Sequence, residues 1–322
     1  MPFLLPIELM NSIDKIVIIT KKTAYEELLE RFNTASQAKF YIEHMGGSFA
    51  EYAAAHDVYR RSMERVRHAV PAGMRSQEID REFLPTFTFG PNDMVVTVGP
   101  DGLVVNTAKY LDGQPLVAIN PDPIRIDGVL VPFIVNIVER YLPFAIAGAL
   151  GSKCVSMAKA TLNDGQTIYA VNDLFIGQRT HVSARYRLKS GQRGEDQSSS
   201  GVIVSTGAGS TGWLRSVVTG AVGITQSYFE EEDVDDIGDD YRFPWDADYL
   251  RYSVREPFVS RTSAAGLIYG RIDAREPLEL TSFMPQNGVI FSDGVEADYI
   301  DFNSGAIAKI GVAEKKLRLV TH

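Results

Sequence analysis

The sequence predicts an α/β domain with a parallel sheet, followed by a mostly β domain. In the first part of the chain, short β-branched segments alternate with helical patterns, an order typical of a parallel sheet. Beyond about Pro132, short apolar segments alternate with turn residues, as in antiparallel β structure. We therefore expect a first domain over residues 1–133 and a second over 134–322. An alternative in which the C-terminal "KKLRLV" returns to the first domain stays open.

The first domain begins with the short β-branched segment "KIVIIT", Lys15–Thr20, which predicts a buried strand. Ser48 and Glu51 predict a capping box at the start of a helix that runs to Val70. Further strands are expected at 94–98 and 116–119. Ligands of a parallel sheet bind beyond the carboxyl ends of its strands, so we look for the site there.

The second domain follows a linking helix through "FIVNIVERYL". Its expected strands are "CVSMAKATL", "QTIYAVNDLFIG", "SARYRLKS", "GVIVST", "YLRYSV", "LELTSF" and "GVIFSDG". Two polar stretches interrupt them. Residues 190–201 read as a flexible turn, and the acidic run 229–240 reads as a solvated loop in preference to a metal site.

Composition excludes several classes of function. The net charge of −9 argues against broad binding to nucleic acid or to an anionic membrane, and no apolar run is long enough to span a bilayer. One cysteine and five scattered histidines give no metal-ligand spacing, so we expect no metal site built from these side chains. The N-terminus has no secretory or transit pattern, so the cytoplasm is the expected location.

A loop of glycine and proline interrupts the apolar segment "VVTVGPDGLVV", Val95–Val105. Glycines after a buried strand allow backbone N–H groups to approach a phosphate, although Pro100 has no N–H to donate. The alternative is a tight turn, since Pro-Asp-Gly is common in turns.

Three further motifs lie in the second half of the chain. "STGAGSTGW", Ser205–Trp213, suits a strand-to-helix turn that faces a polar ligand, or only a capped helix start. Asn172 and Asp173 interrupt an apolar strand and could hold ribose hydroxyls or cap a turn. Asp293 and Gly294 predict a hairpin turn.

Together these motifs, in this order, resemble the ATP-dependent NAD kinases. The resemblance also includes "KKTAYEELLERF", "INPDPIRIDGVL", "SVREPFVSR" and "FNSGAIAKI", and it is greatest for the mitochondrial type and its bacterial relatives. It implies a two-domain kinase, usually a homo-oligomer such as a dimer. Such a kinase transfers the γ-phosphate of ATP to the 2′-hydroxyl of the adenosine ribose of NAD, with a divalent metal such as Mg²⁺.

The resemblance also assigns roles to individual residues. Asp101 would orient or deprotonate the attacking hydroxyl, and Gly99 and Gly102 would shape the loop for phosphate. Asn172 and Asp173 match an Asn-Glu pair that holds ribose. The residues that match the turn lining the dinucleotide site are Gly209, Ser210, Thr211, Gly212 and Trp213, the last where many members have a tyrosine that stacks on adenine.

The chain departs from the family at several positions. The family loop Gly-Gly-Asp-Gly-Thr is Gly-Pro-Asp-Gly-Leu here, which removes an N–H at Pro100 and a hydroxyl at Leu103. Asp173 replaces a glutamate, and Ser200 stands where many bacterial members have an aspartate. An NAD(P) sensor without activity, or a kinase of a sugar or lipid, therefore remains an alternative. Candidate phosphate-binding cations are Lys153, Arg215, Arg251 and Arg255.

Overall fold

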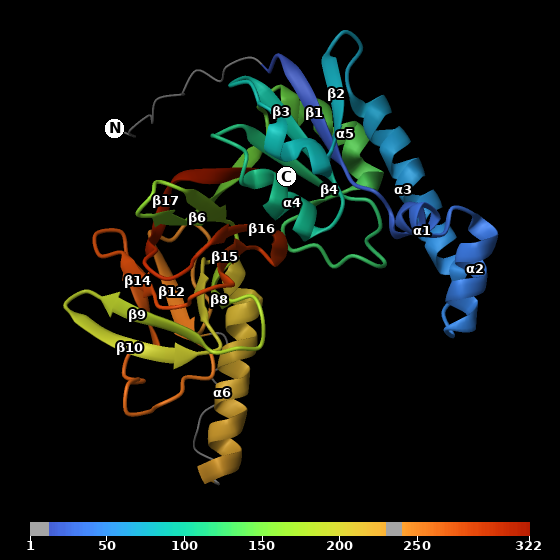
Figure 1. Cartoon of the computed structure of the whole chain (residues 1–322). Helices are drawn as coiled ribbons and strands as arrows, with labels where there is room; N and C mark the ends of the chain where they lie inside the picture. The colour runs from blue at the N-terminus through green and yellow to red at the C-terminus, as the bar shows by residue number, and fades with distance from the viewer. Residues whose placement is uncertain (1–12, 230–239) are drawn as a thin grey trace, which may run out of the picture. The chain divides into compact units, whose positions relative to one another are not determined.

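The computed structural model describes residues 13–229 and 240–322, and the chain folds as two units (Figure 1). The first unit is Met1–Lys153 together with Arg318–His322, and the second is Cys154–Leu317. The division expected at residues 133 and 134 falls inside the first unit. Most of the acidic run, residues 230–239, lies outside the described residues.

The first unit contains a parallel sheet in the order β2-β1-β3-β4, and the end of β17 pairs in parallel with β4. Its elements are β1 (Lys15–Thr20), α1 (Ala24–Phe32), α2 (Ala35–His44), α3 (Phe49–Ala69), β2 (Arg75–Asp80), η1 (Arg81–Thr86), β3 (Asp93–Val98), α4 (Asp101–Ala108), β4 (Pro115–Asn120), β5 (Phe133–Ile134), η2 (Val135–Ile137) and α5 (Val138–Ile146).

The strands β1, β3 and β4 consist almost entirely of apolar residues because both faces of this sheet are covered. Residues such as Met63 and Val66 of α3 and Leu142 of α5 pack with the strands in one buried cluster. From β1 the chain continues to β2, which lies at one edge of this sheet. The later strands β3 and β4 follow one another in the opposite direction from β1. The order therefore reverses between β1 and β3, and this switch point lies next to Gly99.

Two local predictions for this unit were wrong. Ser48 precedes α3, but its side chain makes no capping bond, because the N–H of Glu51 donates to the backbone oxygen of Ser48 (3.2 Å). A capping box occurs instead at α1, between Thr23 and Glu26. The expected linking helix starts only at Val138, since Phe133–Ile134 pairs with β4 as β5.

The second unit contains two sheets, one of them six-stranded and antiparallel in the order β13-β12-β11-β8-β15-β16. In the other, β10-β9-β14-β17 is continued by β6 and β7. The elements from residue 151 onward are β6 (Gly151–Leu162), β7 (Thr167–Ala170), β8 (Asp173–Gln178), β9 (Ala184–Ser190), β10 (Arg193–Ser199), β11 (Val202–Ser205), η3 (Gly209–Thr211), α6 (Trp213–Phe229), β12 (Tyr249–Val254), β13 (Tyr269–Asp273), β14 (Leu278–Ser282), β15 (Gly288–Ser292), β16 (Val295–Asp301) and β17 (Ile307–Thr321).

Along strands such as β9 and β14, every second residue is buried, and the buried side chains of both sheets form one apolar core. Leu188 of β9 and Leu280 of β14 belong to the same buried cluster as Ile176 of β8 and Val204 of β11. Among the described helices, none is long and apolar enough to cross a membrane.

The polar stretch 190–201 is not a flexible turn, which corrects the expectation from sequence. It turns at Gly191 (φ +58°) and again at Gly201 (φ +107°), and between these turns Arg193–Ser199 pairs with β9 as the edge strand β10. The buried polar residues on this strand have partners: Gln197 donates to the carbonyl of Leu267 (3.1 Å), and Ser199 bonds the hydroxyl of Tyr186 (2.7 Å). A polar sequence therefore forms a strand here because its buried side chains are hydrogen-bonded.

The segment "QTIYAVNDLFIG" is also not one strand. It divides into β7, which pairs with β6, and β8, which pairs with β11 and β15 in the six-stranded sheet. Val171 and Asn172 form the break between them. The polar pair thus marks the point at which the chain passes from one sheet to the other.

Candidate functional site

The glycine loop of the first unit joins β3 to α4. The N–H of Gly99 donates to the backbone oxygen of Ile119 (3.0 Å), and that of Leu103 donates to Pro100 (2.9 Å). Pro100 is the N-cap residue of α4, and its φ of −76° suits proline. The N–H groups of Asp101 and Gly102, in the first turn of α4, form no hydrogen bond with the described residues. These two donors at a helix start can bind an anion.

The carboxylate of Asp101 is bound by the backbone of a neighbouring loop. One oxygen accepts the N–H of Val129 and the other accepts that of Leu130, both at 2.9 Å. These bonds fix the orientation of the carboxylate. Each carboxylate oxygen has a second lone pair, so the group can still accept a hydrogen bond from a ligand hydroxyl.

The loop that binds Asp101 takes its shape from Asn120, the last residue of β4. Its side-chain amide donates to the backbone oxygen of Ile126 (2.8 Å), and its side-chain oxygen accepts the N–H of Asp122 (3.0 Å). Gly128 has a φ of +66°, and a Cβ there would lie 2.2 Å from Cγ2 of Val131. The asparagine and the glycine of the motif "INPDPIRIDGVL" are therefore needed for the hydrogen bonds and the tight turn of this loop.

In the second unit, Asp293 lies in the turn between β15 and β16. It has a φ of +55° and is followed by Gly294, as the predicted hairpin requires. Its carboxylate accepts the N–H groups of Val171 (3.1 Å), Asn172 (2.7 Å) and Asp173 (3.3 Å). Its own N–H donates to the backbone oxygen of Asp173 (2.9 Å). The hairpin turn therefore holds the break between β7 and β8.

The turn "STGAGSTG" contacts the same break. The N–H of Thr206 donates to the backbone oxygen of Asn172 (2.9 Å), and its hydroxyl donates to that of Val171. A Cβ at Gly209 would lie 2.0 Å from the Asn172 oxygen, so only glycine fits at this distance. The motifs at 172–173, 205–213 and 293–294 thus come together within the second unit.

Asp173 is a buried carboxyl, with only 8% of its surface exposed. Burial, and secondarily the charge of Asp293, raise the pKa of Asp173 to about 7. The group therefore changes charge near neutral pH. At such a pH it can act either as a hydrogen-bond donor or as an acceptor toward a hydroxyl.

The remaining predicted residues lie at the start of α6. Ser210 is buried and donates to the backbone oxygen of Gly207 (2.7 Å), Thr211 donates to Ala208 (3.5 Å), and the N–H of Gly212 donates to Gly209 (2.9 Å). Those three residues stabilise the turn itself.

Trp213 stacks on Phe175, with ring centroids 5.7 Å apart. The Arg255 guanidinium lies 5.4 Å from the centre of the Trp213 ring. Stacking of this ring on adenine stays a prediction.

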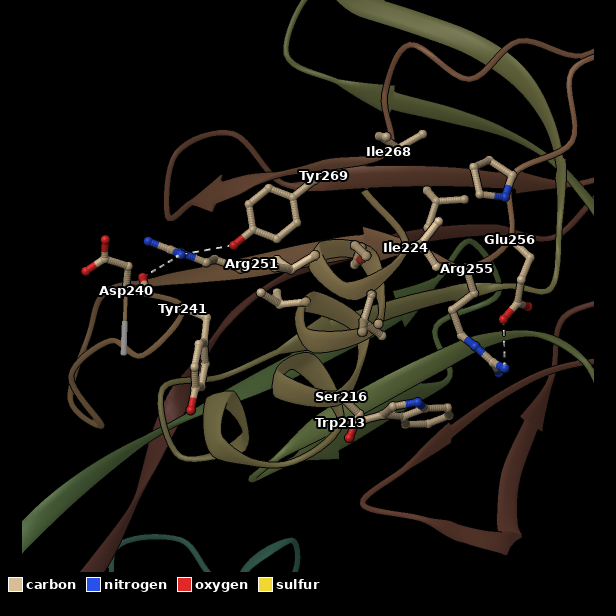
Figure 2. A pocket seen from close by; sticks show the side chains of 18 residues that line it. Trp213, Ser216, Ile224, Asp240, Tyr241, Arg251, Arg255, Glu256, Ile268 and Tyr269 are labelled. Carbon is tan, nitrogen blue, oxygen red and sulfur yellow. Dashed lines mark hydrogen bonds and ion pairs between the residues drawn. The ribbon is translucent and has the colours of Figure 1, made fainter. Parts of the chain in front are cut away.

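A cavity of about 800 Å³ separates α6 from β12 and β13 (Figure 2). Its lining is mainly apolar, and it includes Trp213 together with two of the candidate phosphate-binding cations, Arg251 and Arg255. Arg251 bonds the hydroxyl of Tyr269 (2.9 Å), and Arg255 pairs with Glu256 (3.6 Å). Arg251 and Arg255 therefore already have partners in the chain. Arg215 is exposed on α6, and Lys153 belongs to the first unit.

Sequence reasoning missed two features of the site. It treated Asp293 only as a turn residue, although an aspartate with positive φ next to a glycine can turn its carboxylate toward a neighbouring segment. It also missed that the N–H groups of Val129 and Leu130 bind Asp101, because a backbone donor leaves no signal in a sequence. No group of three or more potential metal ligands occurs among the residues that the structure describes.

Comparisons with known proteins give a consistent result at the level of fold. No protein-family model and no curated protein matches the chain. A crystal structure of yeast NADH kinase with NADH matches at a TM-score of 0.62 and 14% identity, covering 96% of this chain and 83% of that one. An Archaeoglobus fulgidus NAD kinase in complex with ATP matches at 0.54 and 15%, covering 95% and 92%. This chain therefore has the two-domain fold of the NAD and NADH kinases.

Proposed function

We propose that this chain is an NAD kinase, which transfers the γ-phosphate of ATP to the 2′-hydroxyl of the adenosine ribose of NAD or NADH. The observation that carries the proposal is the meeting of three polar motifs at the break between β7 and β8. Two proteins of the same fold are described with NADH or ATP bound, which supports a nucleotide as ligand.

Each unit would contribute a different part of the reaction. Asp101 would accept the 2′-hydroxyl hydrogen and orient its oxygen, while the N–H groups of Asp101 and Gly102 would bind phosphate. Asn172, Asp173 and the turn at 206–213 would hold the dinucleotide. Phosphoryl transfer depends mainly on positioning and charge neutralisation, so an oriented carboxylate and donors to phosphate suit this reaction.

We include a divalent metal, Mg²⁺, in the proposal. The described residues offer no cluster of three ligands, which fits an ion that is bound largely by substrate phosphates, as Mg²⁺ commonly is. The ion would neutralise phosphate charge. A homodimer and a relation to the mitochondrial type are further expectations that follow from the resemblance in sequence, and a cytoplasmic location is the expectation from the N-terminal residues.

The test is an NADP-forming assay with ATP, Mg²⁺ and either NAD or NADH, with binding of NAD measured on the same sample. Wild-type protein is expected to form product, and Asp101→Asn to lose about 100-fold or more in kcat while it still binds NAD. Asp112→Asn, at a surface loop of the same unit, is the matched charge control. Unchanged turnover in Asp101→Asn would remove this carboxylate from the mechanism.

A second candidate is an NAD(P) sensor without transferase activity. It is favoured by Pro100, which offers no N–H to a phosphate, and by the two backbone N–H groups that already bind Asp101. Binding of NAD without product would support the sensor. Phosphorylation of a sugar or a lipid, but not of NAD, would instead show a kinase of another substrate.

A further inference from the structure

We propose that Asp293 is a positioning residue of the dinucleotide site, which holds Asn172 and Asp173 in place through their backbone N–H groups. The inference rests on the proposed function for its ligand, but its geometry lies wholly within the second unit. The sequence indicated only a turn at this position, and nothing in the resemblance gave Asp293 a role.

The bonds of Asp293 are more than a hairpin turn needs. The chain reverses here through the positive φ values of Asp293 (+55°) and Gly294 (+71°), for which asparagine or glycine would serve equally well. The carboxylate is directed instead to another segment, about 120 residues away in sequence, where it accepts three consecutive N–H groups. A negative acceptor strengthens such bonds, so the charge matters and not only the shape.

Val171 and Asn172 lie in the break between β7 and β8, whereas Asp173 is the first residue of β8 and pairs with Ser205 of β11. The N–H groups of Val171 and Asn172 lie outside both ladders, so they need another acceptor in this buried region. On the opposite side, the N–H of Thr206 donates to the backbone oxygen of Asn172 (2.9 Å), and Gly209 approaches the same oxygen so closely that a Cβ at position 209 would lie 2.0 Å from it. Asp293 and this turn therefore fix the Asn172 backbone together.

Asp293 also acts on the charge of Asp173. Burial raises the pKa of Asp173 most, and the negative charge of Asp293 raises it further. No other charged group among the described residues contributes to this shift. The turn at 205–211 on the other side consists of small neutral residues and contributes no titratable side chain. Replacing the Asp293 carboxylate should thus lower the pKa of Asp173 as well as loosen the strand break.

The first experiment needs no catalysis. Amide hydrogen exchange is measured across residues 171–173 in the wild-type protein, in Asp293→Asn and in Asp301→Asn, a matched control at the other end of the same hairpin. We expect protected amides in the wild type and in the control, and exchange at least about tenfold faster in Asp293→Asn. Unprotected amides in the wild type would overturn the proposal without any variant, even if Asp293→Asn failed to fold.

The second experiment measures the pH dependence of charge and binding. The Asp173 carboxyl is titrated by ¹³C NMR, and the Kd for NAD is measured from pH 5 to 9. We expect the midpoint of the Asp173 titration to be lower by about one pH unit in Asp293→Asn than in the wild type. In each protein, we expect NAD to bind more tightly below this midpoint, because neutral Asp173 does not repel the phosphates of NAD. An unchanged midpoint and Kd would overturn the proposal.

The two proposals can fail separately. If the wild type forms no NADP but the amides are protected and the midpoint shifts, the kinase function fails and the role of Asp293 stands. If NADP forms, we expect Asp293→Asn to raise the KM for NAD more than it lowers kcat, because Asp293 acts on binding through Asn172 and Asp173. A fall in kcat alone would contradict a positioning role.

Discussion

Asp101 in the first unit and Asp293 in the second use the same device in different surroundings. Each belongs to an Asp-Gly pair and accepts consecutive backbone N–H groups from a distant segment. Around Asp101 there is space: a Cβ at Gly102 would contact nothing within 4 Å. Near Asp293, Cβ atoms at Gly207 and Gly209 would lie within about 2 Å of backbone oxygens.

This difference accounts for the two changes in the loop of the first unit, Pro100 and Leu103. Pro100 fits the N-cap position of α4, and Leu103 is buried in the core, with 2% of its surface exposed. The open loop can therefore change its residues and keep its fold. The turn at 205–213 has no such freedom at Gly207 and Gly209, where a Cβ would overlap backbone atoms.

The largest expected effect is that of Gly209→Ala. The new Cβ would overlap the oxygen of Asn172, so backbone must move, and we expect a loss of at least about 3 kcal/mol in the free energy of unfolding. Denaturant melts measure it, and NAD binding should also be lost. Gly102→Ala is the matched control in the open loop, with an effect within about 1 kcal/mol of zero. Equal effects of the two variants would break the comparison.

Asp173→Asn should change how stability depends on pH. The pKa of Asp173 in the folded protein, about 7, is above its ordinary value of 3.8, so the folded state binds more protons between these values. The free energy of unfolding should therefore fall as pH rises from about 4 to about 7 in the wild type.

In Asp173→Asn, the free energy of unfolding should no longer fall over this pH range. At pH 8 it should exceed that of the wild type by on the order of 2 to 4 kcal/mol. Thermal unfolding at pH 5 and pH 8 measures the difference between the two proteins. Asp301→Asn controls for the loss of one negative charge on the unit. Parallel curves for wild type and Asp173→Asn would show that Asp173 does not titrate in this range.

The smallest expected effect is that of Pro100→Ala. It restores a backbone N–H at the loop, and one bond from this donor to a phosphate should lower the KM for ATP by about three- to tenfold. Steady-state kinetics at varied ATP measure it. Pro100→Gly restores the same donor with a more flexible backbone. A lower KM for ATP in Pro100→Gly alone would therefore show that backbone flexibility, and not the added N–H, causes the change. No change in either variant would show that this position does not contact ATP.

The sequence predicted the class of fold well, because periodicity reports which faces are buried. It correctly indicated the strands at 15–20 and 94–98 and the hairpin turn at Asp293 and Gly294, but it took "QTIYAVNDLFIG" as one strand where the chain forms β7 and β8 in different sheets. Strand β10 was missed because the amide nitrogen of its buried Gln197 and the hydroxyl of Ser199 form hydrogen bonds with residues outside the strand, Leu267 and Tyr186. The contacts of Asp101 and Asp293 were missed for the same reason, since they join segments that only the folded chain brings together.

Strand β17 has a consequence for synthesis on the ribosome. Its last residues pair with Pro115 and Leu116 of β4, and Val320 belongs to the apolar core of the first unit. On this side of β4, β5 pairs with Ile119 and Asn120, so the nascent first unit emerges with Pro115 and Leu116 unpaired there and with its core lacking Val320. During translation, the edge of this sheet would stay open to wrong partners, so completion of the first unit must be among the last events of folding.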